Sequence, residues 1–213
     1  LMKLPKDAWV IGPNNTALVV IDMQRTFTDE GAPYECIGAR ELVPKINDLA
    51  AMCRKLELPV IFVKANYGVD LCDGGLMKDF HSWPSDTEMK PQAGMKGAEL
   101  CPGLDVHSDD YIVPKVRYSA FIQGSSNLES LLRSLGRDSI IICGVVTDVC
   151  VGATTIDAMM LGFKIFFVGD LTATRSEERQ KIALELYNAR FAKVMTFDAV
   201  MKELARLAEG KVP

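Results

Sequence analysis

The sequence predicts an α/β fold, with a doubly wound, mainly parallel six-stranded sheet and helices on both of its faces. Two observations predict this fold class. Short apolar runs alternate with segments of helical period along almost the whole chain, which is the pattern of successive β-α units. The apolar runs are also continuous instead of alternating with polar residues. Continuous runs are typical of strands that are covered on both faces, as strands of parallel sheets are.

The first β-α-β unit is predicted in the N-terminal third of the chain. Apolar runs at residues 17–22 and 59–65 predict two strands, and apolar residues recur at helical spacing from Leu42 to Leu56 between them. Further strands are expected at residues 111–114, 140–143, 164–168 and 194–197. Helices are expected at residues 128–135, 151–161, 177–190 and 200–207.

Residues 67–109 interrupt this alternation. The segment is rich in glycine and proline and has little periodicity. An irregular segment of this length inside a compact domain is usually a binding loop or a lid, so we expect a lid or substrate loop here. The 213 residues, of which 48% are hydrophobic and 24% charged, fit one globular domain spanning residues 1–213.

The composition also indicates which classes of partner the protein binds. The formal net charge of −4 gives no basic surface for nucleic acid or anionic membrane, which favours a small-molecule partner. No apolar run is long enough to cross a bilayer, and no secretory signal is visible, so we expect a soluble, cytoplasmic protein. The six cysteines are scattered without a C-x-x-C pair, which argues against structural zinc and thioredoxin-like redox chemistry.

Three residues with reactive side chains follow predicted strands. Asp22 ends the first strand, Lys115 comes directly after the strand at residues 111–114, and Cys150 follows the strand at residues 140–143. In parallel α/β sheets, ligands bind outside the carboxyl ends of the strands. Each residue alone has an ordinary explanation, as a cap, a solvated charge or a buried thiol. Their coincidence at one edge predicts a shared site.

Cys150 lies in the first turn of the helix that follows its strand. Unpaired backbone N–H groups at a helix N-terminus lower the pKa of a thiol and can also hold an oxyanion. The sequence therefore predicts a nucleophile and its stabiliser in one turn.

The sequence lacks the residue patterns that several other kinds of catalytic or binding site require. The two histidines, His81 and His107, both lie in the irregular segment, so a thiol–imidazole pair requires that segment to fold over Cys150; Asp22 is better placed as the base. No G-x-S-x-G nucleophile elbow and no glycine-rich phosphate motif occurs. Two separated D-x-H pairs fall short of the three protein ligands that catalytic zinc usually takes. We expect no metal and no cofactor.

Three ordered motifs, at residues 20–24, 114–121 and 144–151, resemble those of the isochorismatase-like cysteine hydrolase family, and the match extends from Thr16 to about Ala208. The resemblance implies an isochorismatase-like, Rossmann-like three-layer fold. It also implies an Asp–Lys–Cys triad at Asp22, Lys115 and Cys150, and a cis peptide between Val145 and Val146. That bond would aim the backbone N–H groups of Val146 and Cys150 at one point as an oxyanion hole.

Differences among the family's branches narrow the expected reaction. Nicotinamidases carry an aspartate and two histidines that bind a metal after the second strand, and residues 63–72 contain no histidine. Asp79 and His81 match part of that pattern without a second histidine close by, so a nicotinamide substrate is less favoured but stays open. Siderophore-pathway isochorismatases, which cleave a vinyl ether, lack the cysteine. The sequence at residues 115–121 is most similar to the corresponding stretch of the family's ureido and carbamoyl amidohydrolases. We therefore expect a cysteine-dependent amidohydrolase that cleaves a small amide, ureido or carbamoyl compound through a thioester and releases ammonia or an amine. We also expect a homo-oligomer, either a dimer or a tetramer.

The predicted pocket wall consists of residues that flank the motifs or lie in the lid: Gln24, Phe27, Trp83, Tyr118 and Phe121. Aromatic residues pack in cores at least as often, and Gln24 could instead satisfy a local backbone group. Three rival functions stay open at this point. They are an isochorismatase-type vinyl ether hydrolase, a catalytically silent interaction module, and a redox-active thiol protein.

Overall fold

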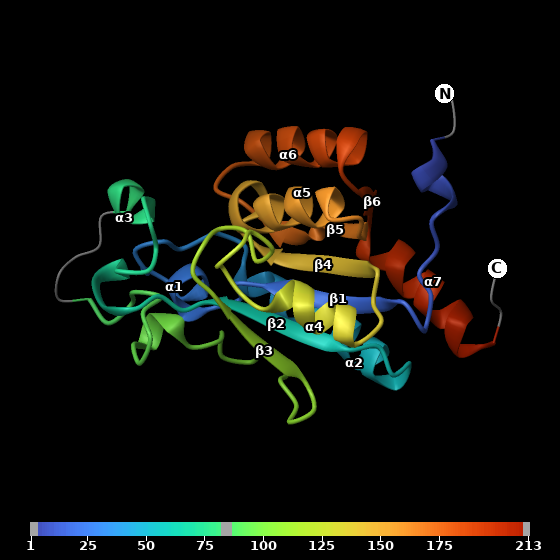
Figure 1. Ribbon diagram of the computed structural model, residues 1–213, viewed down its shortest axis with the longest axis horizontal. Helices are drawn as coiled ribbons and strands as arrows, with labels where there is room; N and C mark the ends of the chain where they lie inside the picture. The colour runs from blue at the N-terminus through green and yellow to red at the C-terminus, as the bar shows by residue number, and fades with distance from the viewer. Residues whose placement is uncertain (1–3, 82–86, 211–213) are drawn as a thin grey trace.

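The computed structural model describes residues 4–81 and 87–210. Its centre is a six-stranded sheet in the order β3-β2-β1-β4-β5-β6, in which all neighbouring strands are parallel (Figure 1). The strands are β1 (Thr16–Ile21), β2 (Val60–Ala65), β3 (Tyr111–Lys115), β4 (Ser139–Val145), β5 (Lys164–Ala173) and β6 (Lys193–Met195). The chain winds outward from β1 to β3 and then returns to place β4 on the other side of β1. This confirms the predicted doubly wound fold.

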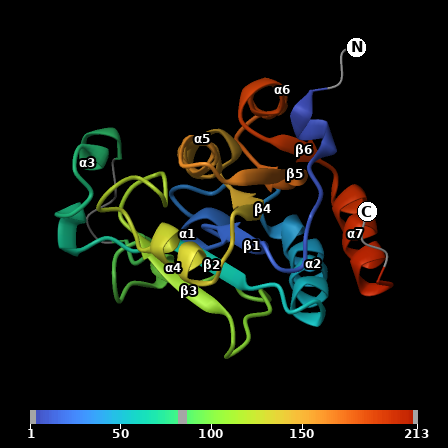
Figure 2. The same cartoon turned by 45° about the vertical axis from the view of Figure 1, so that its right-hand side comes forward.

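Helices cover both faces of the sheet, as Figure 2 shows. One face carries α2 (Val43–Lys55) and α7 (Phe197–Ala208), and the other carries α4 (Leu128–Ser134), α5 (Gly152–Met160) and α6 (Glu177–Arg190). Successive side chains of a strand point to opposite faces. Leu18 and Val20 accordingly pack in the core of the first face, and Val19 and Ile21 in that of the second. Two covered faces explain why β1 is continuously apolar from Ala17 to Ile21.

Shorter elements lie mainly around the carboxyl edge of the sheet. They are α1 (Arg25–Thr28), α3 (Met77–Phe80) and the 3₁₀ turns η1 (Pro5–Ala8), η2 (Arg40–Leu42), η3 (Val69–Leu71) and η4 (Lys96–Ala98). The segment at residues 67–109 is anchored by backbone bridges that pair Tyr67 with Gln92 and Leu100 with Gln24. Among the residues that the structure describes, no helix is long and apolar enough to span a membrane.

The C-terminal boundaries differ from the prediction. The strand expected at residues 194–197 ends at Met195, because the side chain of Thr196 accepts a hydrogen bond from the backbone N–H of Ala199 and caps α7. The last helix therefore begins at Phe197 instead of Val200. Ahead of α5, residues Thr147–Val151 form a π-helical turn, η5, which the sequence pattern merges with the helix.

Gly144 on β4 pairs with Ile21 on β1. Its φ is +108°, and a Cβ atom added there would lie 2.1 Å from the carbonyl oxygen of Ile21. We expect Gly144→Ala to lower the free energy of unfolding by about 2–5 kcal/mol, from backbone strain and overpacking together. Urea unfolding measures this. Gly124→Ala is the matched control, because Gly124 has a φ of +79° and nothing within 4 Å of the added atom. Equal losses in the two variants would contradict the close approach.

Candidate active site

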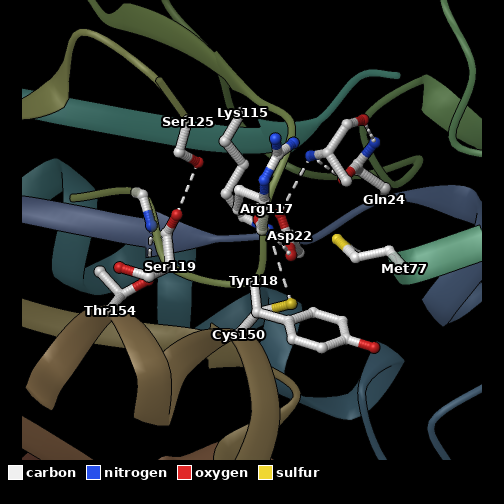
Figure 3. A network of polar contacts seen from close by, with 12 residues as sticks. Asp22, Gln24, Met77, Lys115, Arg117, Tyr118, Ser119, Ser125, Cys150 and Thr154 are labelled. Carbon is white, nitrogen blue, oxygen red and sulfur yellow. Dashed lines mark hydrogen bonds and ion pairs between the residues drawn. The ribbon is translucent and has the colours of Figure 1, made fainter. Parts of the chain in front are cut away.

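Asp22, Lys115 and Cys150 meet at the carboxyl ends of β1, β3 and β4 (Figure 3). The Nζ atom of Lys115 lies 2.9 Å from Oδ2 of Asp22 and 3.5 Å from Sγ of Cys150. Asp22 and Lys115 have no exposed surface, and Cys150 is 5% exposed. The structure thus brings together the three residues that the sequence places at one sheet edge.

Backbone geometry aims the carboxylate of Asp22. The residue lies directly after β1 with a φ of +50°, a conformation that costs roughly 1–2 kcal/mol for a residue with a side chain. Its Oδ1 atom accepts the backbone N–H of Ala65 at 3.0 Å, and its own N–H donates to the carbonyl oxygen of Val63 at 2.9 Å. One carboxylate oxygen is therefore held by β2, and the other faces Lys115.

Lys115 is held as an ammonium ion. Its Nζ atom also donates to the carbonyl oxygen of Arg117 at 2.9 Å. Burial acts to lower the pKa of Lys115, but the opposite effect of the nearby Asp22 and Cys150 is larger, and the pKa is raised overall. A lysine that holds its proton this firmly cannot serve as the base for the thiol. It places a positive charge beside Asp22 and Cys150.

The pKa of the Cys150 thiol is raised, in contrast to the lowered value that the helix N-terminus predicts. Burial is the largest cause; the positive charge of Lys115 opposes it, and the carboxylate of Asp22 raises the pKa further through its charge and a hydrogen bond. The resting thiol is therefore protonated, and a reaction that uses it as a nucleophile requires a base. Transfer of its proton to Asp22 leaves the total charge of the buried group unchanged, so no net charge is created away from water.

A cavity of about 220 Å³ opens above Cys150. This is below the roughly 300–1,000 Å³ of sites for drug-sized ligands, so the site suits a small molecule. Its wall includes five aromatic residues: Phe27, Tyr34, Tyr67, Phe80 and Tyr118. Asp148, Arg175 and Arg179 supply charge on the wall.

An isochorismatase domain matches residues 16–199 of this chain. The chain belongs to the isochorismatase family. It is 33% identical over 199 residues to the isochorismatase of Bacillus subtilis (strain 168), covering 93% of this chain but only 61% of that protein's length. It is 35% identical to a probable inactive nicotinamidase of Arabidopsis thaliana, covering 77% of this chain and 83% of that one.

Similarity also extends to amidohydrolases of the family. The chain is 28% identical to the ureidoacrylate amidohydrolase of Pseudomonas syringae pv. syringae, covering 87% of this chain and 82% of the relative. A cysteine hydrolase from Pseudomonas syringae pv. phaseolicola 1448A has the same fold, with a TM-score of 0.85 and 27% identity, covering 92% of this chain and 95% of that one. The isochorismatase family is a family of hydrolases, and the fold agrees with those of its solved members.

The predicted pocket residues of this isochorismatase-family chain separate into three groups. Phe27 and Tyr118 line the cavity. Gln24 and Phe121 do not, which corrects their predicted place in the wall: Gln24 is fully buried, where its amide donates to Ala65 and Ala98 carbonyl oxygens at 2.8 and 3.1 Å. Phe121 packs against Phe163 in the core, with ring centroids 5.1 Å apart. Trp83 lies outside the described residues.

The cavity wall also contains residues that are absent from the predicted set. Tyr67 and His81 come from the segment predicted as a substrate loop, but an irregular segment has no period from which their direction could be read. His81 lies 3.1 Å from the Tyr118 hydroxyl through Nε2, and burial lowers its pKa. Arg175 lies two residues beyond β5. The rule that placed Asp22 at a strand end applies equally to Arg175.

The oxyanion hole is predicted in the turn between β4 and Cys150. The peptide bond between Val145 and Val146 is cis, and Val146 lines the cavity beside Cys150. The carbonyl oxygen of Val146 accepts backbone N–H groups of Val149 and Val151 at 3.1 and 3.2 Å. An oxyanion hole formed by the N–H groups of Val146 and Cys150 stays a prediction.

Neither D-x-H pair belongs to a cluster of metal-ligand type. Across residues 4–81 and 87–210, no group of three or more histidine, cysteine or acidic side chains converges. His107 pairs with Asp105 at 3.0 Å, in a group that also contains Arg54. All six cysteines are free.

Proposed function

We propose that this protein is a cysteine-dependent amidohydrolase that cleaves a C–N bond in a small amide, ureido or carbamoyl compound. One observation carries the proposal: the Cys150 thiol lies 3.5 Å from the Lys115 ammonium, which pairs with Asp22, at a cavity of small-molecule size. Nucleophile, charge and base are the three parts that thiol catalysis needs.

In the first half-reaction, Asp22 takes the proton from Cys150 and Sγ attacks the substrate carbonyl carbon. The oxyanion that forms is held by the backbone N–H groups of Val146 and Cys150. When the tetrahedral intermediate collapses, the C–N bond breaks and Asp22 gives its proton to the leaving nitrogen. The products of this step are ammonia or an amine and a thioester on Cys150.

In the second half-reaction, Asp22 takes a proton from water, whose oxygen attacks the thioester carbonyl. Collapse of this second intermediate breaks the C–S bond and returns the proton to Sγ. Lys115 keeps its own proton throughout. Its positive charge stabilises whichever of Asp22 and Cys150 is anionic at each stage.

Arg175 points to an acidic substrate. It is exposed at the cavity wall, where its guanidinium lies 5.8 Å from the Tyr34 ring centroid. No ion pair joins it to any carboxylate of the described residues, whereas Arg179 on the same wall is paired with Asp148. A guanidinium of this kind suits a carboxylate group. The ureidoacrylate amidohydrolase among the relatives is named for a substrate with such a group.

Arg175→Gln is therefore expected to raise KM for an acidic substrate by about 10- to 100-fold, the effect of losing one charge-assisted contact. The matched substrate is its carboxamide, which lacks the charge and should be affected less than threefold. Steady-state kinetics on both compounds measures the difference. Arg190→Gln, on the exposed end of α6, is the control variant. An equal rise in KM for both substrates would remove Arg175 from anion binding.

The proposed function is tested by assaying ammonia or amine release from ureides, carbamoyl amino acids, maleamate and nicotinamide. Turnover of at least one C–N substrate, lost in Cys150→Ala, is the expected result. The similarity to the Bacillus subtilis isochorismatase favours vinyl ether cleavage as a second candidate. Cleavage of isochorismate that persists in Cys150→Ala, with no C–N substrate turned over, would select that candidate. Inactivity on every compound would favour a silent interaction module.

We further infer that residues 67–109 form the substrate loop, because Tyr67, Met77 and His81 from this segment line the cavity. A dimer or tetramer also stays our expectation for the assembly. Sedimentation of the purified protein measures it.

A further inference from the structure

Residues Thr147–Val151, which contain Cys150, are called the nucleophile turn below. Asp148 lies in this turn, and both oxygens of its carboxylate accept hydrogen bonds. Oδ2 accepts from Nε and Nη2 of Arg179 at 2.6 and 2.5 Å, and Oδ1 accepts from the Thr174 hydroxyl at 2.5 Å. Asp148 lines the cavity, but its carboxylate already accepts from three donors. Its carboxylate is engaged in structure, and Asp22 is the one that faces the thiol.

A second contact joins the same turn to the same helix. The Tyr187 hydroxyl on α6 donates to the carbonyl oxygen of Thr147 at 3.2 Å. Burial raises the pKa of Tyr187 to about 12, so the hydroxyl keeps its proton. A Cβ atom added to Gly152 would lie 1.9 Å from this hydroxyl oxygen, so a glycine at this position is what lets Tyr187 reach the turn.

The turn itself has little regular support. Thr147–Val151 form a π-helical turn between β4 and α5, and such turns occur mostly as single turns, frequently at functional sites. The turn contacts α6 twice: the Asp148 side chain bonds to Arg179, and the Thr147 carbonyl oxygen bonds to Tyr187. Arg179 and Tyr187 lie about two helical turns apart on α6. Together they fix the turn at two points from one rigid element.

We propose that α6 acts as a clamp on the nucleophile turn, with Arg179 and Tyr187 as positioning residues that hold Cys150 and the Val146 and Cys150 N–H groups in place for acylation. This rests on the proposed function of Cys150 as the nucleophile. Misplacement of reacting atoms by about 1 Å can slow a reaction 10²-fold. Loss of the clamp should therefore lower the rate of acylation without changing the affinity for the substrate.

The test uses full-length protein and p-nitrophenyl acetate, an activated ester whose carbonyl carbon Cys150 attacks. The thiol proton passes to Asp22 as the S–C bond forms, the C–O bond breaks, and p-nitrophenolate leaves. The acetyl group stays on Sγ, so the burst of p-nitrophenolate reports acylation. We expect Asp148→Asn and Arg179→Gln each to slow the burst at least tenfold, and the double variant to be no slower than the worse single one. The half-saturating ester concentration should change less than twofold. Arg190→Gln is the control and should behave as wild type.

Two further variants separate positioning from loss of fold. Tyr187→Phe removes only a hydroxyl and should slow the burst about threefold or more without a matching change in Tm. In Arg179→Ala, added guanidinium at millimolar concentration should restore at least a third of the lost rate, which a collapsed structure would not permit. A burst within twofold of the Arg190→Gln control in both Asp148→Asn and Arg179→Gln would overturn the clamp. A normal wild-type burst without turnover of any C–N substrate would instead reject the proposed function and leave the clamp standing.

Discussion

Cys150→Ser is expected to lower kcat for C–N hydrolysis by at least about a thousandfold, the scale on which nucleophile variants of other hydrolases lose activity. A serine hydroxyl is far less acidic than a thiol, and the base opposite it is a carboxylate, which is too weak to ionise it. The substitution replaces one atom in a site whose other contacts remain. We therefore expect circular dichroism and Tm to stay close to those of wild type.

The measurement is kcat for the best substrate of the C–N panel. Cys72→Ser is the matched control, because Cys72 is an exposed free thiol, and it should keep full activity. Retention of more than about 5% of wild-type kcat by Cys150→Ser would contradict the nucleophile role, given the weaker nucleophilicity of the hydroxyl.

Lys115→Met is expected to have the second largest effect, on activity and stability together. Removing one partner of a buried ion pair leaves the other charge uncompensated, which typically costs about 3–5 kcal/mol. Asp22 and Lys115 are both fully buried and 2.9 Å apart. Activity should fall at least about a thousandfold, because an anionic Asp22 or Cys150 then has no opposing charge.

The stability effect of Lys115 has a defined pH window. The pKa of Lys115 is raised in the folded protein, so its pairing stabilises wild type fully below the unfolded value of about 10.4 and is lost only as pH rises through the higher folded value. Urea unfolding at neutral pH measures the loss in the variant. The double variant Asp22→Asn/Lys115→Met should be more stable than Lys115→Met alone, because it leaves no unpaired carboxylate. If it is less stable, the buried pair is not the cause.

The sheet could be predicted because its strands are buried on both faces, and burial on both faces leaves continuous apolar runs such as residues 17–22. Asp22, Lys115 and Cys150 could be predicted for a topological reason, since carboxyl ends of parallel strands share one edge. The same rule applies to Arg175, which the sequence did not indicate because this strand was predicted to end at residue 168, whereas β5 continues to Ala173. The segment at residues 67–109 gave no periodicity to place His81.

Other parts depend on packing that the sequence does not encode locally. Phe121 and Tyr118 lie three residues apart in one motif, yet Tyr118 lines the cavity and Phe121 packs in the core. The pKa of Cys150 was predicted from the helix N-terminus, which the sequence shows, but burial determines its direction. The partners of Asp148 come from residues 174 and 179, and only the folded chain brings them to it.

The central claim is that Cys150 forms a covalent acyl intermediate with a C–N substrate. Rapid quenching within the first turnover, followed by mass spectrometry of the intact protein and its peptides, tests it most directly. The account predicts an acyl group on Cys150 in wild type, formed and lost at rates that match kcat, and absent from Cys150→Ser. Full turnover with no adduct on Cys150 at any time, or an adduct on another residue, would contradict it.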